Sequence, residues 1–236
     1  MNEFRPLYAR IRQTLVDRLA AGEWAPGTAL PSEAALAREL GASQGTVRKA
    51  VGLLVDEGVL QREQGRGTFV AEQTPEHANY RFFRLFHPDG ERAVPELLRQ
   101  VGGVKKADAG QAAALDIEPG TDVQVLVRLR TIAGAPALEE TIAIPMEIMP
   151  ELMIFSPLPN ALYPYYQSRY GLHVARTEER VSATAATERQ ARKLEIAAGA
   201  PLLRIERTAY DLNARPIEHR VSHFVTNGLT FRVDLR

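Results

Sequence analysis

The chain has 236 residues and no cysteine, 45% of its residues are hydrophobic, and 29 basic side chains balance 29 acidic ones. This length allows one large or two modest domains, and the lack of cysteine excludes disulfides and thiolate metal sites. No apolar run approaches the roughly 20 residues that cross a bilayer, so we expect a soluble, cytoplasmic protein with no membrane partner.

The first two predicted elements are helices. Apolar residues recur every four positions from Leu7 to Leu19, which predicts a helix from about Pro6 to Ala21. Ser32 is a good N-cap for a second, shorter helix, and Glu33 then lies in its first turn, where a carboxylate is favourable.

A third helix is predicted after the turn at Gly41-Ala42-Ser43, with Ser43 as its N-cap. Val47, Val51 and Leu54 form the apolar stripe that packs this helix onto its neighbours. Its first turns leave polar or small residues off that stripe, namely Gln44, Gly45, Arg48 and Lys49. Gly45 costs about 1 kcal/mol relative to alanine inside a helix, and its missing side chain allows close backbone approach.

Two short strand-like runs follow Gly58, joined by Gln64-Gly65-Arg66-Gly67. The glycines permit the positive φ values of a tight hairpin, and Arg66 at the tip could reach a minor groove. The whole order predicts a helix-turn-helix with a β-wing, a device that enters DNA grooves. The alternative for Arg48 and Lys49 alone is a solvated helix face. A phosphate-binding loop is rejected, because no Lys-Ser/Thr follows the glycines.

The charge of this segment is unusual for a nucleic-acid binder, because residues 1–72 carry nine basic and nine acidic side chains. DNA binding would therefore depend on local segregation of charge and on dimerisation, which doubles the phosphate contacts.

A long-range repeat fills much of the remaining chain. Residues 112–144 and 191–225 share the order short helix, strand, turn, strand, and four residues of the first copy match the second at one constant spacing. We therefore expect two similar α+β halves that share one sheet, with a pocket near their junction.

Alternation along the first strand of this repeat places Arg128 and Arg130 on one face, together with Gln124 and Leu126. Glu140 lies across the hairpin and can pair with Arg130 if the register is favourable. Two arginines facing a cleft would suit an anionic ligand, and the alternative is a surface ion pair.

The N-terminal motifs resemble the winged helix-turn-helix of the GntR family of bacterial transcription regulators. The resemblance rests on Leu30-Pro31-Ser32-Glu33, on residues 43–48 and on residues 64–70. Ala34 and Gln44 replace arginines that are common in the family. The DNA-binding residues that it implies are Ser32, Glu33, Ser43, Gln44, Gly45, Thr46, Arg48, Lys49, Gln64, Gly65, Arg66 and Gly67.

From about Tyr80 to Val233 the chain resembles the UTRA ligand-binding domain of HutC-type GntR regulators, which has a chorismate-lyase-like fold. Ala161 and Phe224 replace a serine and a tyrosine of sugar-phosphate sensors, and Arg81-Phe82-Phe83-Arg84 replaces their usual Phe-Thr. These departures favour a carboxylate-bearing or less polar effector. The effector-binding positions implied by the resemblance are Phe82, Phe83, Arg128, Arg130, Glu140, Tyr163, Glu218 and Phe224.

Together these features predict an α+β protein with a DNA-binding domain at 1–72, a linker at 73–79 and an effector-binding and dimerisation domain at 80–236. We expect a homodimeric repressor that binds a near-palindromic DNA operator and is released by an anionic small molecule. An activator of the same family and, more remotely, an enzyme of chorismate-lyase-like fold are the alternatives. No catalytic motif, metal site or cofactor is predicted, and His219 and His223 are interpreted as ordinary strand histidines.

Overall fold

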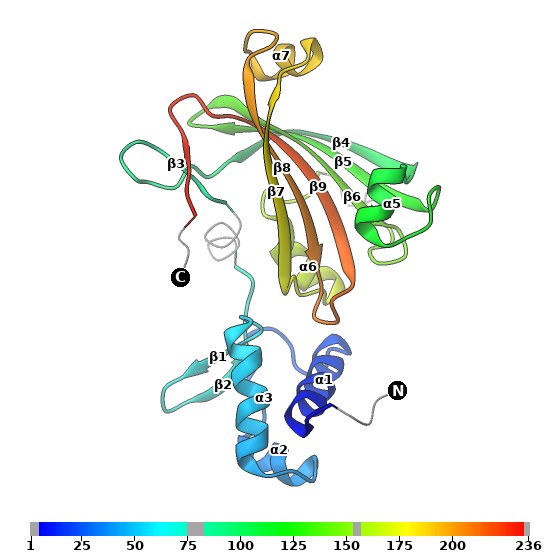
Figure 1. Ribbon diagram of the computed structural model, residues 1–236. Coiled ribbons are helices and arrows are strands. Elements are labelled where there is room, and N and C mark those ends of the chain that lie inside the picture. The colour runs from blue at the N-terminus through cyan, green and yellow to red at the C-terminus, as the bar shows by residue number, and fades with distance from the viewer. Residues whose placement is uncertain (1–4, 75–82, 153–156, 234–236) are drawn as a thin grey trace. The chain divides into compact units, whose positions relative to one another are not determined.

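A computed structural model of the chain describes residues 5–74, 83–152 and 157–233 (Figure 1). The chain divides into two compact units. The first unit comprises residues 1–74, 163–176 and 211–214, and the second comprises residues 75–162, 177–210 and 215–236.

Three helices open the first unit: α1 (Leu7–Ala20), α2 (Glu33–Glu39) and α3 (Gln44–Asp56). Both predicted serine caps are confirmed. The Ser32 hydroxyl accepts a hydrogen bond from the Ala35 backbone N–H, and the Ser43 hydroxyl accepts one from the Thr46 N–H, each at 3.2 Å. These caps satisfy N–H groups that a helix start leaves without a partner, so the chain begins each helix at a defined residue.

The core of this unit is formed by the predicted apolar stripes. Leu15 of α1, Leu36 of α2 and the α3 residues Val47 and Leu54 are 1% exposed or less. Their packing holds the three helices together and leaves the opposite side of α3 at the surface.

The wing is an antiparallel hairpin of β1 (Leu60–Glu63) and β2 (Gly67–Val70), seen beside α3 in Figure 1. Gly65 has φ +75° and Gly67 has φ +128°, which confirms why the turn carries glycines. The first unit also contains α6 (Leu162–Tyr170) apart from its first residue, and this helix ends before Gly171 at φ +65°.

The second unit is built on a six-stranded antiparallel sheet of order β4-β5-β6-β9-β8-β7. Its strands are β4 (Glu96–Lys106), β5 (Asp122–Ile132), β6 (Ala135–Pro145), β7 (Arg176–Ala185), β8 (Pro201–Tyr210) and β9 (Pro216–Val225). A small second sheet pairs β3 (Leu85–Phe86) with β10 (Thr230–Phe231). The mixed helix and antiparallel-sheet fold is the one expected.

The predicted repeat is confirmed in detail. Helix α5 (Ala109–Leu115) begins with a capping box of Asp108 and Gln111, and α7 (Glu188–Leu194) begins with one of Thr187 and Gln190. Both helices end at a residue in the left-handed conformation. Each then leads into a hairpin, and the two hairpins meet where β6 pairs with β9 at the centre of the sheet.

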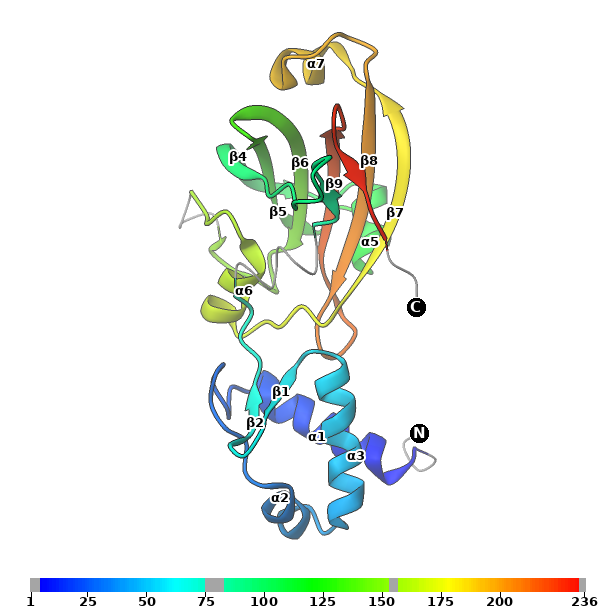
Figure 2. The same ribbon diagram turned by 90° about the vertical axis from the view of Figure 1, so that its left-hand side faces the viewer.

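The two faces of the large sheet have different covers. The α5 helix packs with Val123, Val125 and Ala143, and the α7 helix packs with Leu202 and Leu129, which all point to one face. The opposite face carries the residues that pack against the β3–β10 sheet, which lies over it in Figure 2. None of the described helices is long and apolar enough to cross a membrane.

Candidate DNA interface and effector pocket

The first turns of α3 present the predicted residues to solvent. Gln44, Gly45, Arg48 and Lys49 are all exposed, whereas Val47 and Ala50 of the same turns are fully buried. The Ser43 and Thr46 hydroxyl groups lie 2.7 Å apart and fix the helix start. This surface offers backbone N–H groups, an amide and two cations, which are the groups that contact phosphates and base edges.

Gly45 is not required by the packing of the described residues. A Cβ atom added there would meet the Ser43 hydroxyl oxygen at 3.9 Å as its nearest neighbour among the described residues, which is ordinary contact. The helix therefore carries a destabilising glycine without an internal reason, and the open backbone is suited to close approach by a ligand.

The cations of this surface are held by neighbouring side chains. The Lys49 ammonium lies 3.8 Å from the centre of the Tyr8 ring, and Arg66 at the wing tip pairs with Glu63 and lies 5.3 Å from the Phe69 ring. Arg48 and Arg62 both pair with Glu33. These partners limit the freedom of long side chains at the surface.

A buried ionic network occupies the second unit, on the sheet face opposite α5 and α7. Its centre is Glu140, directly across from Arg128 in the register of β5 and β6. One Glu140 oxygen lies 3.7 Å from Arg128 Nη1 and 3.6 Å from Arg130 Nη1, and the other lies 3.2 Å from Arg220 Nη1. The alternative of a surface ion pair is wrong, because none of the Arg128, Arg130 and Glu140 side chains is more than 1% exposed.

Burial and charge act in opposite directions on this network. Burial alone would raise the pKa of Glu140, but the guanidinium groups of Arg220, Arg130 and Arg128 hold that pKa below its ordinary value. Burial also lowers the pKa of Arg130 to about 10, against the opposing effect of Glu140. Glu140 and Arg130 are therefore both charged at neutral pH.

Arg128 and Arg130 also anchor loops of the second unit. The Arg128 Nη2 group donates to the carbonyl oxygens of Pro159 at 2.9 Å and Asn160 at 3.1 Å. Arg130 Nη2 donates to the Pro95 carbonyl oxygen at 2.6 Å. These charge-assisted hydrogen bonds give the two arginines a structural role in addition to their proximity to Glu140.

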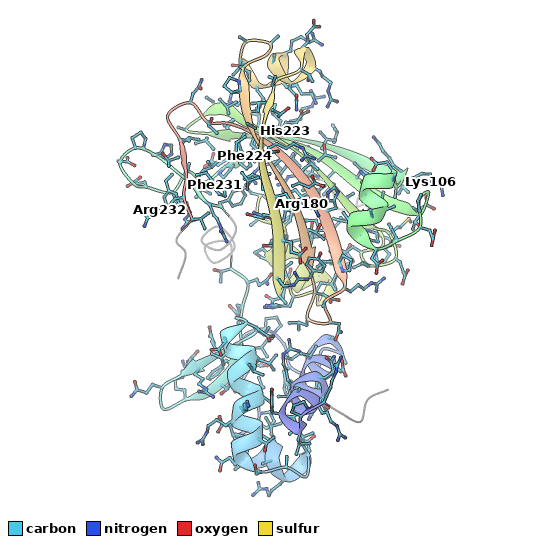
Figure 3. All side chains as sticks on the ribbon, viewed as in Figure 1. Lys106, Arg180, His223, Phe224, Phe231 and Arg232 are labelled. Atoms are coloured by element: carbon cyan, nitrogen blue, oxygen red, sulfur yellow. The ribbon has the colours of Figure 1, made fainter. Side chains whose placement is uncertain are left out.

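A pocket of about 390 Å³, which includes solvent at its mouth, opens beside this network. Its walls come from four strands of the large sheet and from the β3–β10 sheet, and Figure 3 labels Phe224 and Phe231 among them. The lining combines aromatic and aliphatic side chains with charged ones: Phe83, Arg84, Leu85, Glu140, Glu179, Ile205, Arg207, Arg220, Ser222, Phe224 and Phe231.

Three of the effector-binding positions implied by the sequence line this pocket: Phe83, Glu140 and Phe224. Arg128, Arg130 and Glu218 are buried next to it but are not part of its lining. Tyr163 is buried on α6 with its ring centre 5.8 Å from that of Tyr166, and it does not line the pocket either. Phe82 lies outside the described residues.

Sequence reasoning missed Arg207 and Arg220, two of the three arginines that line the pocket. Arg207 donates to the Glu179 carboxylate from Nε at 2.7 Å, and Arg220 binds Glu218 through Nε and Nη2, each at 2.9 Å. A signal for Arg207 was present, because it occupies the position of Arg128 in the second copy of the repeat. Glu179 comes from β7, a strand whose polar sequence gives no such signal.

His219 and His223 point to the other face of the sheet. His219 Nε2 lies 3.1 Å from a Glu206 oxygen, and burial, followed by Arg204, lowers the pKa of His223. Within the described ranges, no group of three or more acidic or histidine side chains could hold a metal ion.

Two family models match the chain. Residues 7–70 match the family described as bacterial regulatory proteins, gntR family, and residues 102–229 match the UTRA domain.

Related proteins align over nearly the whole chain. The chain is 30% identical, over 97% of its length and 94% of the relative, to the probable fructoselysine utilization operon transcriptional repressor of Escherichia coli K12. It is 31% identical, over 96% of its length and 93% of the relative, to the transcriptional repressor NagR of Bacillus subtilis. The crystal structure of PhnF from Mycobacterium smegmatis is 26% identical, with a TM-score of 0.56 over 96% of this chain and 99% of that one.

Proposed function

Since the chain belongs to the GntR family of bacterial transcriptional regulators, with a helix-turn-helix domain and a UTRA effector-binding domain, we propose that it is a homodimeric repressor released by a small acid. The observation that supports DNA contact most directly is the exposed start of α3. There a serine cap, a glycine that the fold does not need and two cations lie on one side of a buried stripe.

The charge of the N-terminal domain supports homodimerisation. Residues 1–72 have no net charge, so one copy gains little general attraction to DNA. Two copies double the phosphate contacts and place two recognition helices in major grooves about 34 Å apart. The operator is then a near-palindrome, and the protein works in the cytoplasm, where that DNA lies.

The buried charges beside the pocket support an acidic effector. The network contains four guanidinium groups (Arg128, Arg130, Arg207 and Arg220) and three carboxylates (Glu140, Glu179 and Glu218). Among the described side chains that these ion pairs join, positive charges outnumber negative ones by one, and they lie in a region shielded from water. An anion that enters the pocket compensates this charge, while its apolar part contacts Phe83, Phe224 and Phe231.

Release from DNA requires that the effector bind one arrangement of the dimer better than the other. The names of the relatives identify repressors of utilization or metabolic systems, which suggests that this chain represses genes for the use of its own effector. We propose binding without turnover, because the carboxylates of the pocket wall, Glu140 and Glu179, are engaged in ion pairs with arginines rather than arranged as a nucleophile and a base.

The test begins with selection of operator duplexes from random DNA by the purified protein. Each candidate acid is then compared with its uncharged amide in thermal-shift and DNA-release assays. We expect a two-fold symmetric selected sequence, and an acid that stabilises the protein and releases DNA while its amide does neither. If the selection enriches no sequence, this result would contradict DNA recognition. Stabilisation by the amide as large as that by the acid would contradict the acidic effector, and DNA binding strengthened by the acid would indicate an activator or co-repressor mechanism.

A further inference from the structure

Glu33, in the first turn of α2, binds two arginines that belong to two other elements. Its Oε2 accepts a hydrogen bond from Arg48 Nε of α3 at 2.8 Å, and its Oε1 lies 3.4 Å from Arg62 Nη2 of β1. The Glu33 side chain is 20% exposed, whereas the Arg48 and Arg62 side chains are 61% and 49% exposed. One carboxylate thus joins the recognition helix to the wing.

A carboxylate at this place is electrostatically unfavourable for DNA binding. Phosphates repel it, and the pairing neutralises part of the positive charge that DNA would otherwise attract. Exposed ion pairs contribute little to stability, so the fold alone gives a weak reason for it. The geometry of the Glu33 contacts gives a stronger reason for a carboxylate at this place.

The contact with Arg48 uses the Nε edge of the guanidinium. Both terminal nitrogens, Nη1 and Nη2, are therefore left to form the two parallel hydrogen bonds that a guanine edge or a phosphate accepts. We propose that Glu33 is a positioning residue rather than the DNA contact that the family resemblance implies. It holds Arg48 with its fork facing the groove and holds Arg62 beside it.

Two guanidinium groups that reach the same carboxylate would repel each other without it. Each would then spread over many rotamers, and binding would have to restrict both side chains. Glu33 removes this repulsion and orders the two arginines before DNA arrives. This inference rests on the proposed DNA-binding function and adds that two of its arginines are positioned before DNA binds.

The test is the Glu33→Gln variant, which keeps the side-chain length but removes the charge. The matched control is Glu39→Gln on the same helix, because Glu39 pairs with Arg18 of α1 at 2.9 Å and is 51% exposed. Affinities are measured for the selected operator and for a shuffled duplex of the same length and composition, with circular dichroism as a check of folding.

Simple electrostatics predicts that both variants bind all DNA more tightly. Positioning instead predicts that Glu33→Gln weakens operator binding about fivefold or more, which is the lower range for loss of a bidentate base contact, while binding to the shuffled duplex is unchanged or tighter. The ratio of the two affinities should be unaffected in Glu39→Gln. In an Arg48→Ala background, Glu33→Gln should weaken operator binding by less than twofold.

The inference is overturned if Glu33→Gln binds the operator as tightly as the wild type, if Glu39→Gln loses the same discrimination, or if the full loss persists in the Arg48→Ala background. A wild-type protein that does not distinguish operator from shuffled DNA would contradict the proposed function itself. The two failures are therefore distinguishable.

Discussion

Arg128 and Arg207 occupy equivalent positions in the two halves of the large sheet, yet their guanidinium groups have different partners. Arg128 donates to the carbonyl oxygens of Pro159 and Asn160, whereas Arg207 donates to Glu179 in the wall of the pocket. In the first half, backbone carbonyl oxygens accept hydrogen bonds from the arginine. In the second half, the equivalent arginine lines the opening for a ligand.

Glu140→Gln should strongly destabilise the protein. The substitution leaves Arg128, Arg130 and Arg220 with less negative charge in a fully buried network, and removal of one partner of a buried ion pair costs about 3–5 kcal/mol. Urea unfolding of the wild type and the variant measures this loss. Glu206→Gln, on the other face of the sheet, is the control and should cost much less.

Acid should remove part of the wild-type stability through the same residue. The pKa of Glu140 is lower in the folded protein than its ordinary value, so its contribution is complete above about pH 4.3 and is lost as the pH falls through the folded pKa. The Glu140→Gln variant should not show this part of the loss of stability in acid. Parallel stability curves of the two proteins from about pH 6 down to about pH 3 would contradict the assignment.

Gly45→Ala should stabilise the fold and weaken operator binding. Alanine meets no close contact in the described structure and is better than glycine in a helix by about 0.5–1 kcal/mol. A methyl group at this place would keep DNA from the backbone, so we expect operator affinity to fall by about tenfold, or about 1.4 kcal/mol.

Gly52→Ala is the matched control, because Gly52 lies two turns further along α3 and also has open space around it. The midpoint temperature of thermal unfolding should rise in both variants. Unchanged operator binding by Gly45→Ala would show that the glycine has no role in the interface.

The local parts of the fold were predictable because short-range chemistry determines them. The serine caps of α2 and α3, the glycine wing and the repeated helix-hairpin unit follow from residues close together in sequence, and each was confirmed. The predicted pairing of Glu140 with Arg130, whose charged atoms lie 3.6 Å apart, also required only the register of one hairpin, although the residue directly across from Glu140 is Arg128.

The pocket could not be predicted to the same extent. Glu179 meets Arg207 because β7 joins the far edge of the sheet, and β7 is polar and largely exposed, without apolar alternation. Phe231 reaches the pocket because β10 pairs with β3, which lies far away in sequence. Such nonlocal pairings leave no periodic pattern in one sequence.

Arg66→Ala should weaken binding to every DNA sequence by a similar factor. Arg66 is 71% exposed at the wing tip, so a phosphate or minor-groove contact is its expected role. Its loss should reduce the slope of log affinity against log salt concentration by about one. Lys106→Ala removes an equal charge from the second unit, at the position labelled in Figure 3, and should leave the slope unchanged. Equal slopes for wild type and Arg66→Ala would argue against a contact at the tip.

Arg84→Ala should weaken the effector response without changing DNA affinity. Arg84 lines the pocket beside Phe83 and would contribute a positive charge for an acidic ligand. The measurement is the acid concentration that gives half of the thermal shift, which should rise about tenfold if one charged contact is lost. Arg180→Ala, on β7 but outside the lining, is the control labelled in Figure 3. An equal response from both variants would place the acid elsewhere.

The central claim is that the exposed start of α3 recognises DNA, and hydroxyl-radical footprinting of the selected operator tests it most directly. Wild-type protein should protect two patches separated by about one helical turn, and Arg48→Ala should lose this protection while it still shows the effector-induced thermal shift. Unchanged protection by Arg48→Ala would contradict the account.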